Sequence, residues 1–390
     1  MLTTIYNIYI LSQPVSKANT ILPHSGRLAR CGSAAPRLRC ACKSRIIFCM
    51  KRAFLHFLRA LAGLLSSAAL LTLTGCAGKA ERNLFALDTY IQLTAYGRGA
   101  SAALADCDAE IQRLESLLSV TRVGGDVFRI NQANGAAVSV EPETAALLSE
   151  ARRLAALTGG AFDPTVYPLM RLWGFGDSPA VPEPAAIAAL LPLVDAERLS
   201  VDGVEIALPA GAGIDLGGIA KGYVSDRLAA LLQSRGIESA MLTLGGNVHA
   251  LGSKPNGDAW RVGIQDPQDA NAVAGVIDAR DCAVITSGSY QRYFEENGVR
   301  YHHILNPATG YPADSGLCSV TVIAKSGVEA DALSTALFVM GAENAIAFWR
   351  QYGGFAFVLI TTDGELLYSE NAPFSAADGY AARPVPASAS

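Results

Sequence analysis

Charged and aromatic residues are scarce in this chain of 390 residues, at 17% and 7% of the sequence, whereas hydrophobic residues make up 51%. This composition excludes an intrinsically disordered chain and supplies enough apolar residues for one large or two ordinary domains. The sequence also lacks GxSxG, HExxH, CxxC and GxxxxGK[ST] motifs. These absences argue against a serine hydrolase, a zincin, a thioredoxin-like redox protein and a Walker-type nucleotide site.

Acidic residues are missing from the first 75 residues, which hold 10 of the 31 Lys and Arg but none of the 35 Asp and Glu. The rest of the chain therefore has 21 basic and 35 acidic residues, a net charge of about −14, which argues against nucleic acid as a partner. Cysteine is also rare there. After Cys76 only Cys107, Cys282 and Cys318 remain, so neither a disulfide framework nor a zinc site is indicated.

Residues 50–75 have the order of a secretory signal peptide that ends before Cys76. Lys51 and Arg52 form a basic start, and residues 61–73 form an apolar stretch. The sequence "LTGC" resembles the bacterial lipobox, whose cysteine is acylated, for example with palmitate, and becomes the mature N-terminus. We therefore expect a lipoprotein on the outer face of the cytoplasmic membrane, which is the periplasmic side in a diderm cell. A plain transmembrane anchor is the alternative, but this stretch is shorter than the roughly 20 residues that a span needs.

Residues 1–49 precede this signal peptide, which has a methionine of its own at residue 50. They contain no acids and hold four of the eight cysteines, at spacings that suggest no metal site. Our hypothesis is that they form an untranslated or disordered extension. The functional domain is then expected to span residues 76–390.

Strand and helix patterns alternate from Asn83 onward and predict an α+β protein whose mixed sheets are covered by helices. Period-2 or continuous apolar runs predict strands at residues 86–97, 239–252, 283–287 and 319–324. Helical periodicity predicts helices at residues 101–119 and 144–160 and a turn running into a helix that ends at Gly236. The Asp363-Gly364 pair predicts a hairpin within residues 355–369.

The stretch "TGGAFDPTVYPLMRLWGF" has an acid inside an apolar run. Asp163 stands between Phe162 and Pro164, and Trp173 and Phe175 supply large flat surfaces nearby. A functional carboxylate is one interpretation. A residue that only caps a turn is the alternative, because Asp side chains often bond the backbone two residues on.

The stretch "IDLGGIAKG" combines an acid, two glycines and a lysine. Asp215 ends a strand-like run, Gly217 and Gly218 allow close backbone approach, and Lys221 lies in the first turn of a helix. Backbone amides and a lysine at a helix start suit a phosphate or another anion. A simple tight turn is the alternative.

Three histidines follow Cys76, namely His249, His302 and His303. The last two are adjacent, and neighbours on a strand point to opposite faces, so at most one of them is expected to face a site. A structural role is the alternative for each, since a lone histidine is more often structural.

The stretch "SGVEADALSTALFVMG" places an acid and a hydroxyl in an apolar helix that Gly341 is expected to end. Asp331 and Thr335 are four residues apart and therefore share one helix face. A divalent ion would hold such a carboxylate charged. The alternative is that Asp331 caps the first turn while Thr335 bonds back to a carbonyl one turn earlier.

Six blocks in this order make the chain resemble one family, the FAD:protein FMN transferases, which are ApbE-like flavin-transferring lipoproteins. The blocks are GAFDPTVxPLxxLWGF at residues 160–175, DLGGIAKGYxxD at 215–226, LGGNxxAxG at 244–252, TSGxYxRYF at 286–294, HHIxxPxTG at 302–310 and ADALSTAxFxxG at 330–341. The resemblance covers residues 87–341, nearly the whole chain after Cys76. It implies an ApbE-like, T-fold-type core with mainly antiparallel sheets and a ligand cleft between subdomains.

The chain departs from the family pattern at two positions that contact flavin in the family. Leu87-Asp88-Thr89 stands where many members have Met-Gly-Thr, and Thr121 stands where many have an aromatic residue. Ring stacking on the flavin is therefore expected to differ from the family at Leu87 and Thr121.

The resemblance implies that the enzyme binds FAD with Mg²⁺ against its pyrophosphate, that a Thr or Ser hydroxyl of an acceptor protein attacks the FMN phosphorus, and that AMP leaves. This chemistry needs a hard cation with oxygen ligands, an in-line nucleophile and a base for its proton. His303 is implied as the base, with Asp215 the next candidate. The implied metal ligands are Gly218, Asp331 and Thr335, and the implied FAD-binding residues are Leu87, Thr121, Ala161, Phe162, Asp163, Asp215, Lys221, Thr286, Ser287, Gly288, His303 and Ile304.

Other functions stay open at this point. The same site could hydrolyse FAD to FMN and AMP with water as the nucleophile, or the chain could be a non-catalytic flavin-binding lipoprotein. A solute-binding lipoprotein has only the lipobox in its favour. The acceptor implied by the resemblance is a flavin-carrying subunit of a membrane redox complex or an extracytoplasmic reductase.

Overall fold

The computed structural model describes residues 78–175 and 178–388. The extension at residues 1–49, the signal peptide at residues 50–75 and Cys76 lie outside the described residues. The predicted domain boundaries therefore stay predictions.

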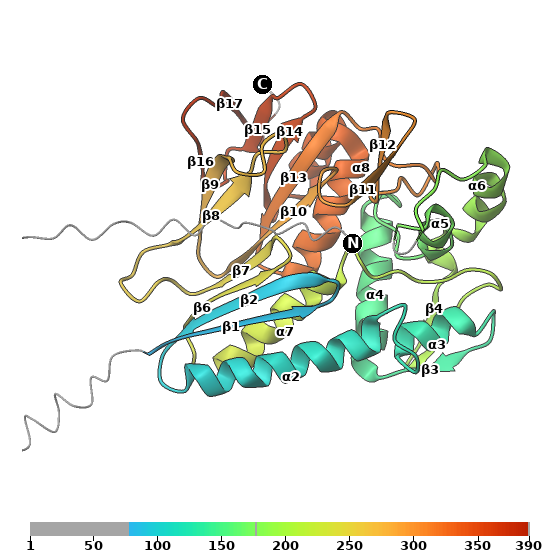
Figure 1. The fold of residues 1–390 in the computed structure, drawn as a ribbon, viewed down its shortest axis with the longest axis horizontal. Coiled ribbons are helices and arrows are strands. Elements are labelled where there is room, and N and C mark those ends of the chain that lie inside the picture. The colour runs from blue at the N-terminus through green and yellow to red at the C-terminus, as the bar shows by residue number, and fades with distance from the viewer. Residues whose placement is uncertain (1–77, 176–177, 389–390) are drawn as a thin grey trace, which may run out of the picture. The chain divides into compact units, whose positions relative to one another are not determined.

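A large, mainly antiparallel sheet organises the described part of the chain (Figure 1). Nine described strands pair side by side, and each pairing is antiparallel except that of the last two, which is parallel. In spatial order they are β1 (Lys79–Ala86), β2 (Thr89–Tyr96), β6 (Ser239–Leu244), β7 (Asn247–Leu251), β10 (Cys282–Gly288), β13 (Leu317–Ala324), β14 (Ala356–Thr361), β15 (Leu366–Ser369) and β17 (Ala382–Val385).

Three long helices cover one face of this sheet (Figure 1). Helices α2 (Ala100–Leu118) and α7 (Ala220–Ser234) pack on β1, β2 and β6, where buried residues such as Leu104, Leu228 and Leu242 form one core cluster. Helix α8 (Gly327–Tyr352) packs on β10 and β13 through a second cluster. The expected α+β fold with helices over mainly antiparallel strands is confirmed.

The opposite face of the sheet packs against a smaller sheet of three described strands. These strands are β8 (Trp260–Gln265), β9 (Val273–Ala279) and β16 (Phe374–Ala376). Trp260, Ile277 and Ile360 are buried in the core between the two sheets. Both faces of the central strands are covered, so β7 is buried along its whole length and residues 356–360 of β14 form a continuous apolar run.

Shorter elements extend beyond the sheet (Figure 1). One group of these elements shares a core cluster with part of α8. It comprises α3 (Asp126–Gln132), α4 (Pro142–Leu157), η2 (Ala196–Arg198), β3 (Val138–Ser139), β4 (Ser200–Asp202) and β5 (Glu205–Ala207). Helices α5 (Tyr167–Trp173) and α6 (Pro184–Leu190), followed by η1 (Leu191–Leu193), pack against the hairpin of β11 (Tyr293–Glu296) and β12 (Val299–His302). Trp173 is the centre of that contact, with rings of Phe175, Phe294 and Tyr301 around it.

Two strand predictions are confirmed only in part, because each predicted strand contains a tight turn. The run 86–97 begins with Leu87 and Asp88, whose φ angles of 54° and 55° form the turn between β1 and β2. The run 239–252 is two strands, β6 and β7, joined at Gly245 and Gly246 with φ angles of 58° and 98°. Two successive residues with positive φ form the turn that best matches the twist of an antiparallel hairpin.

The predicted end of a helix at Gly341 is confirmed in part. Gly341 has φ 77° and ψ 168°, which are not helical angles, but helix resumes at once and α8 continues through this kink to Tyr352. By length and a mean hydropathy of 1.3, α8 could cross a membrane. Its residues Ala332, Ala336 and Phe338 are fully buried, so it is a core helix.

Candidate active site

The candidate site lies where the first turns of α7 and α8 cross. A Cβ atom placed on Gly222 would lie 2.1 Å from the carbonyl oxygen of Gly327, so the two backbones touch and only glycine fits. This close crossing sets Lys221 of α7 beside Asp331 of α8, with Nζ 3.9 Å from Oδ1. The helix starts therefore bring together two of the predicted site residues.

Asp331 is almost fully buried, with 3% of its surface exposed. Its carboxylate accepts hydrogen bonds from the Gly222 backbone N–H at 2.9 Å and from Asn247 Nδ2 at 3.0 Å. The idea that Asp331 caps the first turn of its helix is wrong, because the helix begins at Gly327 and its N-cap is Ser326. A buried carboxylate held by neutral donors and one lysine has capacity left for a cation.

Hydroxyl groups and a glycine meet at Thr335, one helix turn after Asp331. Thr335 Oγ1 lies 3.4 Å from Ser287 Oγ, and it lies 3.4 Å from the carbonyl oxygen of Asp331. A Cβ atom on Gly218 would be 3.4 Å from Thr335 Oγ1 and 3.3 Å from the Phe162 ring. The structure thus brings together the predicted residues Gly218, Asp331 and Thr335, and their oxygen atoms are the kind that Mg²⁺ prefers.

Asp215 and Lys221 meet at the backbone of Gly217. Asp215 Oδ1 accepts a hydrogen bond from Gly217 N at 2.7 Å, and Lys221 Nζ donates to Gly217 O at 3.0 Å. Burial raises the pKa of Asp215 above its usual range, although the nearby charges of Arg292 and Lys221 oppose this shift. The residue is half-buried. The tight turn considered as the alternative is present at Asp215 and Gly217, and the cations Lys221 and Arg292 lie near the Asp215 carboxylate.

His303 is held as a neutral base. Its Nδ1 lies 3.1 Å from the carbonyl oxygen of Arg292, which can only accept, so Nδ1 carries the proton and Nε2 keeps its lone pair. Burial, together with the charge of Arg292, lowers the pKa of His303 to about 3. His302 lies elsewhere: its Nε2 is 3.2 Å from Ala313 O and its ring meets Phe338 edge-on. As expected, the two histidines have different surroundings.

Asp163 uses both carboxylate oxygens within its own fold segment. Oδ1 accepts hydrogen bonds from the backbone N–H of Thr165 at 2.7 Å and from its hydroxyl at 2.5 Å, and Oδ2 accepts from Ala196 N at 3.0 Å. These contacts are those of the turn-capping alternative. The role of Asp163 in FAD binding stays a prediction. Its neighbour Phe162 adjoins Gly218, and Ala161 packs against the core cluster that contains α4.

Glu115 contacts Leu87, one of the two positions that depart from the family pattern, and Arg122, the neighbour of the other. Its carboxylate accepts from Leu87 N at 3.0 Å and from Arg122 at 3.2 Å. Thr121 is exposed and bonds only locally among the described contacts, with Ser119 Oγ at 3.0 Å. Residues of the Leu87 turn also approach the site, since the charge of Asp88 raises the pKa of Asp215.

The remaining predicted residues lie at the end of β10 and after β12. Thr286 Oγ1 is 2.8 Å from Thr321 Oγ1, Ser287 adjoins Thr335, and Gly288 lies against the Tyr290 ring. Ile304 is buried in the α8 core cluster. Ser287 thus reaches the oxygen-lined site directly.

Three residues near the site were missed by the sequence reasoning, namely Asn247, Arg292 and Asp226. Asn247 directly follows the Gly245-Gly246 turn, and that pair of glycines was the available signal. Arg292 stands in the block "TSGSYQRYF" and supplies the carbonyl that orients His303. Asp226 closes the block "DLGGIAKGYVSD", and its carboxylate binds the first turn of α8.

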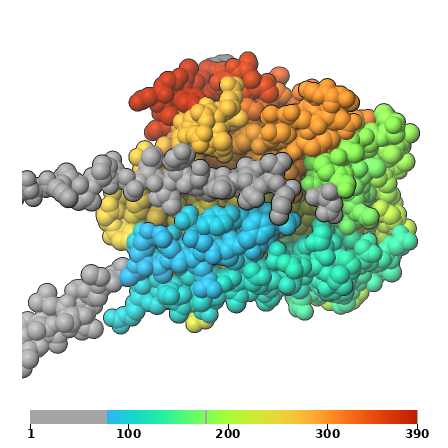
Figure 2. All heavy atoms as spheres, viewed as in Figure 1, coloured from blue at the N-terminus to red at the C-terminus, as the bar shows by residue number. Residues whose placement is uncertain are grey.

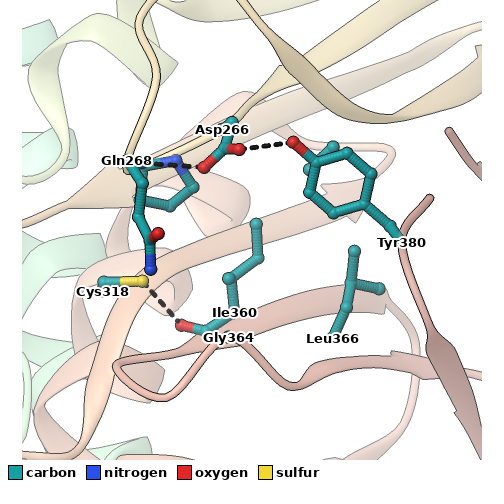
Figure 3. Close-up of a pocket in the computed structure, with 9 residues that line it drawn as sticks. Asp266, Gln268, Cys318, Ile360, Gly364, Leu366 and Tyr380 are labelled. Atoms are coloured by element: carbon teal, nitrogen blue, oxygen red, sulfur yellow. Dashed lines mark hydrogen bonds between the residues drawn. The ribbon is translucent and has the colours of Figure 1, made fainter. Parts of the chain in front are cut away.

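A small cavity lies apart from these residues and shares none of them (Figure 3). It has a volume of about 100 Å³ and is lined by polar groups of Asp266, Gln268, Tyr380 and Cys318 with apolar neighbours. The Cys318 thiol donates to Ile360 O at 3.3 Å, and burial raises its pKa to about 11. Such a thiol is unreactive, so this cavity does not compete as the candidate active site.

The fold and the site together define a class of protein: a helix-covered, mainly antiparallel sheet whose helix starts hold a buried carboxylate, hydroxyl groups and cationic side chains. Residues 87–359 match the sequence model of the ApbE family. The chain belongs to this family.

Curated relatives carry one name. The chain is 39% identical over 282 residues to an FAD:protein FMN transferase of Treponema pallidum, a match that covers 67% of this chain and 78% of the relative. It is 37% identical over 265 residues to an FAD:protein FMN transferase of Klebsiella pneumoniae, covering 66% and 82%.

Solved structures agree with the sequence comparison. The ApbE protein of Thermotoga maritima superposes with a TM-score of 0.71 at 35% identity, covering 74% of this chain and 96% of that one. The flavin transferase ApbE of Vibrio cholerae superposes with a TM-score of 0.68 at 31% identity, covering 76% and 97%.

Proposed function

We propose that this protein is an FAD:protein FMN transferase, which moves the FMN part of FAD onto a Thr or Ser hydroxyl of an acceptor flavoprotein and releases AMP. The observation that carries the proposal is the buried Asp331 carboxylate beside Lys221, in a chain whose family relatives are named for this reaction. A phosphoryl transfer depends mainly on positioning and on offsetting charge, and this site offers groups for both.

A magnesium ion fits the residues present. Among residues 78–175 and 178–388 there is no cluster of three or more His, Cys, Asp or Glu side chains that could hold a metal. That donor set would suit zinc, whereas one carboxylate with hydroxyl and carbonyl oxygens suits Mg²⁺, which keeps waters and shares its ligands with substrate phosphates. Asp331, Thr335 and the Gly218 carbonyl would hold it. Bound there, Mg²⁺ offsets the charge of the pyrophosphate.

The cationic side chains of Lys221 and Arg292 are proposed to bind the pyrophosphate. Lys221 is 26% exposed at its side chain, so its ammonium group can reach a ligand while it stays close to Asp331. Arg292 is exposed, and its charge acts on both Asp215 and His303. Two cations with a helix start at α7 form a site for an anion.

His303 is proposed to take the proton of the acceptor hydroxyl at Nε2, with Asp215 as the next candidate. The Arg292 carbonyl fixes the ring through Nδ1, so Nε2 is the free acceptor. A pKa of about 3 is low for a base. An anionic phosphate beside the ring would raise this pKa, because it stabilises the protonated imidazole.

The flavin is proposed to bind through the other predicted residues. Leu87 has about the volume of the family's methionine, whereas Thr121 replaces an aromatic ring with a small polar side chain, so Thr121 gives the flavin less stacking area. Phe162 and Ser287 adjoin the proposed metal ligands and would lie near the phosphate end.

The proposed location is the outer face of the cytoplasmic membrane, with an anchor at lipidated Cys76. The support is the order of charges and apolar residues in the segment 50–76 and its "LTGC" end. The acceptor would then be a subunit of a membrane redox complex or an extracytoplasmic reductase.

One incubation tests the reaction itself. The full chain, FAD, Mg²⁺ and a candidate acceptor are combined, and the acceptor is examined by mass spectrometry for an added FMN phosphoester. Covalent FMN on a Thr or Ser of the acceptor supports the transferase. Free FMN and AMP without an adduct would show FAD hydrolysis, and intact FAD in all samples would indicate a flavin-binding protein without catalysis.

A further inference from the structure

The carboxylate of Asp226 in α7 ties the start of α8 to α7 through hydrogen bonds next to the candidate site. It accepts hydrogen bonds from the Gly327 backbone N–H at 2.7 Å, from Val328 N at 3.1 Å and from the Ser326 hydroxyl at 3.1 Å. The side chain therefore supplies, from α7, acceptors for the otherwise unpaired N–H groups at the start of α8. Such a carboxylate fixes where α8 begins relative to α7.

A histidine of the sheet completes this tie. His249 of β7 is 7% exposed, and its Nδ1 lies 3.4 Å from Asp226 Oδ1 and 3.2 Å from Ser225 Oγ. Ser225 in turn donates to Gly222 O at 2.8 Å. The network thus joins α7, α8 and β7, which are the same three elements that place Lys221, Asp331 and Asn247.

The geometry shows that this tie and the site are one turn apart. On α7, Gly222 and Asp226 are separated by four residues, and on α8, Gly327 and Asp331 are also separated by four. Gly222 N binds Asp331, and Asp226 binds Gly327 N, so the helices run in opposite directions past two successive contacts. Because the backbones touch at Gly222 and Gly327, a shift at one contact is passed directly to the other.

We infer that Asp226, supported by His249, is a positioning residue for the magnesium site: it holds the first turn of α8 so that Asp331 presents its carboxylate at the proposed ion. Asp226 and His249 act on Asp331 through Gly222 and Gly327, which bond Asp331 and Asp226 respectively. Carboxylates that orient a metal ligand in this way typically contribute 10- to 100-fold in metal affinity. The inference rests on the proposed function only for the identity of the ion.

The chain offers a matched control in Asp126. This residue is 2% exposed, and its carboxylate accepts from Glu141 N at 2.9 Å and from the Thr144 hydroxyl at 2.7 Å at the start of α4. It therefore makes the same kind of helix-start contact with a different helix, and its partners Arg129, Glu141 and Thr144 are not site residues. Asp126→Asn removes a comparable tie without touching the crossing of α7 and α8.

The test is a calorimetric titration of Mg²⁺ into the full chain without FAD, alongside thermal unfolding of each variant. Asp226→Asn is expected to raise the Mg²⁺ dissociation constant about tenfold. Asp126→Asn is expected to lower the unfolding temperature similarly but to keep that constant within about twofold of the wild type. Equal dissociation constants for the two variants overturn the inference.

Two further variants keep the result interpretable. Asp226→Glu retains the charge but is one methylene too long for the tight crossing, so it should also weaken Mg²⁺ binding. Wild-type Mg²⁺ affinity in this variant would show that only the charge matters and would overturn the positioning role. His249→Ala leaves Asp226 in place and should raise the constant about threefold even if Asp226→Asn fails to fold. An unchanged constant in His249→Ala contradicts the support assigned to this residue. Wild-type protein that binds Mg²⁺ but transfers no FMN refutes the proposed function alone.

Discussion

The substitution Asp331→Asn tests the proposed metal site most directly. The carboxylate accepts from Gly222 N and Asn247 Nδ2, and an amide has one oxygen, so one of these donors would face an NH₂ group. A buried donor that loses its acceptor costs about 1–3 kcal/mol. Removing a charge that is 3% exposed relieves part of this cost, so we expect a folded protein with a free energy of unfolding lower by about 1 kcal/mol.

Asp331→Asn should change the affinity for Mg²⁺ much more than it changes the free energy of unfolding. Losing a group that only orients a metal ligand costs about 10- to 100-fold in metal affinity, so losing the charged ligand itself should cost at least about 100-fold. That ratio corresponds to about 2.7 kcal/mol at 1.36 kcal/mol per factor of ten. Thr335→Val, which keeps the shape but removes the hydroxyl, should show a smaller increase in the same direction.

The assay is FMN transfer at increasing Mg²⁺ concentration, with unfolding measured in parallel. Asp126→Asn serves as the control, since it removes a buried carboxylate far along the chain from α8 and should leave the half-saturating Mg²⁺ concentration unchanged. If Asp331→Asn and Thr335→Val both keep the wild-type half-saturation, the carboxylate and the hydroxyl are structural, and the reasoning is refuted.

Three other predictions concern the histidines and the membrane anchor. His303→Ala should lower turnover roughly 10²-fold or more while FAD still binds, whereas His302→Ala should leave turnover within a few-fold, and full activity of His303→Ala would move the role of base elsewhere. Burial lowers the pKa of His303 to about 3, so between that pH and about pH 6.5 the unfolded chain binds more protons than the folded chain. The contribution of His303 to the free energy of unfolding should therefore be complete above about pH 6.5 and fall as the pH drops, and urea unfolding at several pH values should show a weaker pH dependence in His303→Ala. Cys76→Ser should release the protein from membranes or leave it unprocessed, and unchanged anchoring in a membrane fractionation would contradict the lipoprotein assignment.

Local sequence patterns predicted the helices well. The apolar periodicity of α2 and α4 and the start of α7 reflect contacts between residues three or four apart, which a sequence carries directly. The same reasoning put Asp331 and Thr335 on one face of α8, and the structure has their groups one turn apart. Two turns inside apolar runs were missed. Leu87 and Asp88 adopt positive φ without the glycine that usually indicates it, whereas the turn between β6 and β7 does have glycines, at Gly245 and Gly246.

The sequence by itself therefore determined the family, the order of its blocks and the polar residues that each block carries. Tertiary structure alone decided which of those residues meet. Asn247 and Asp331 are separated by 84 residues and Gly222 and Asp331 by 109, and no local period encodes such contacts. Tertiary packing also decided that Asp163 turns its carboxylate to Thr165 and Ala196, while Asp331 keeps its own facing the crossing of α7 and α8. The physical reason is that a buried carboxylate must find donors, and their positions are set by how helices and strands pack together.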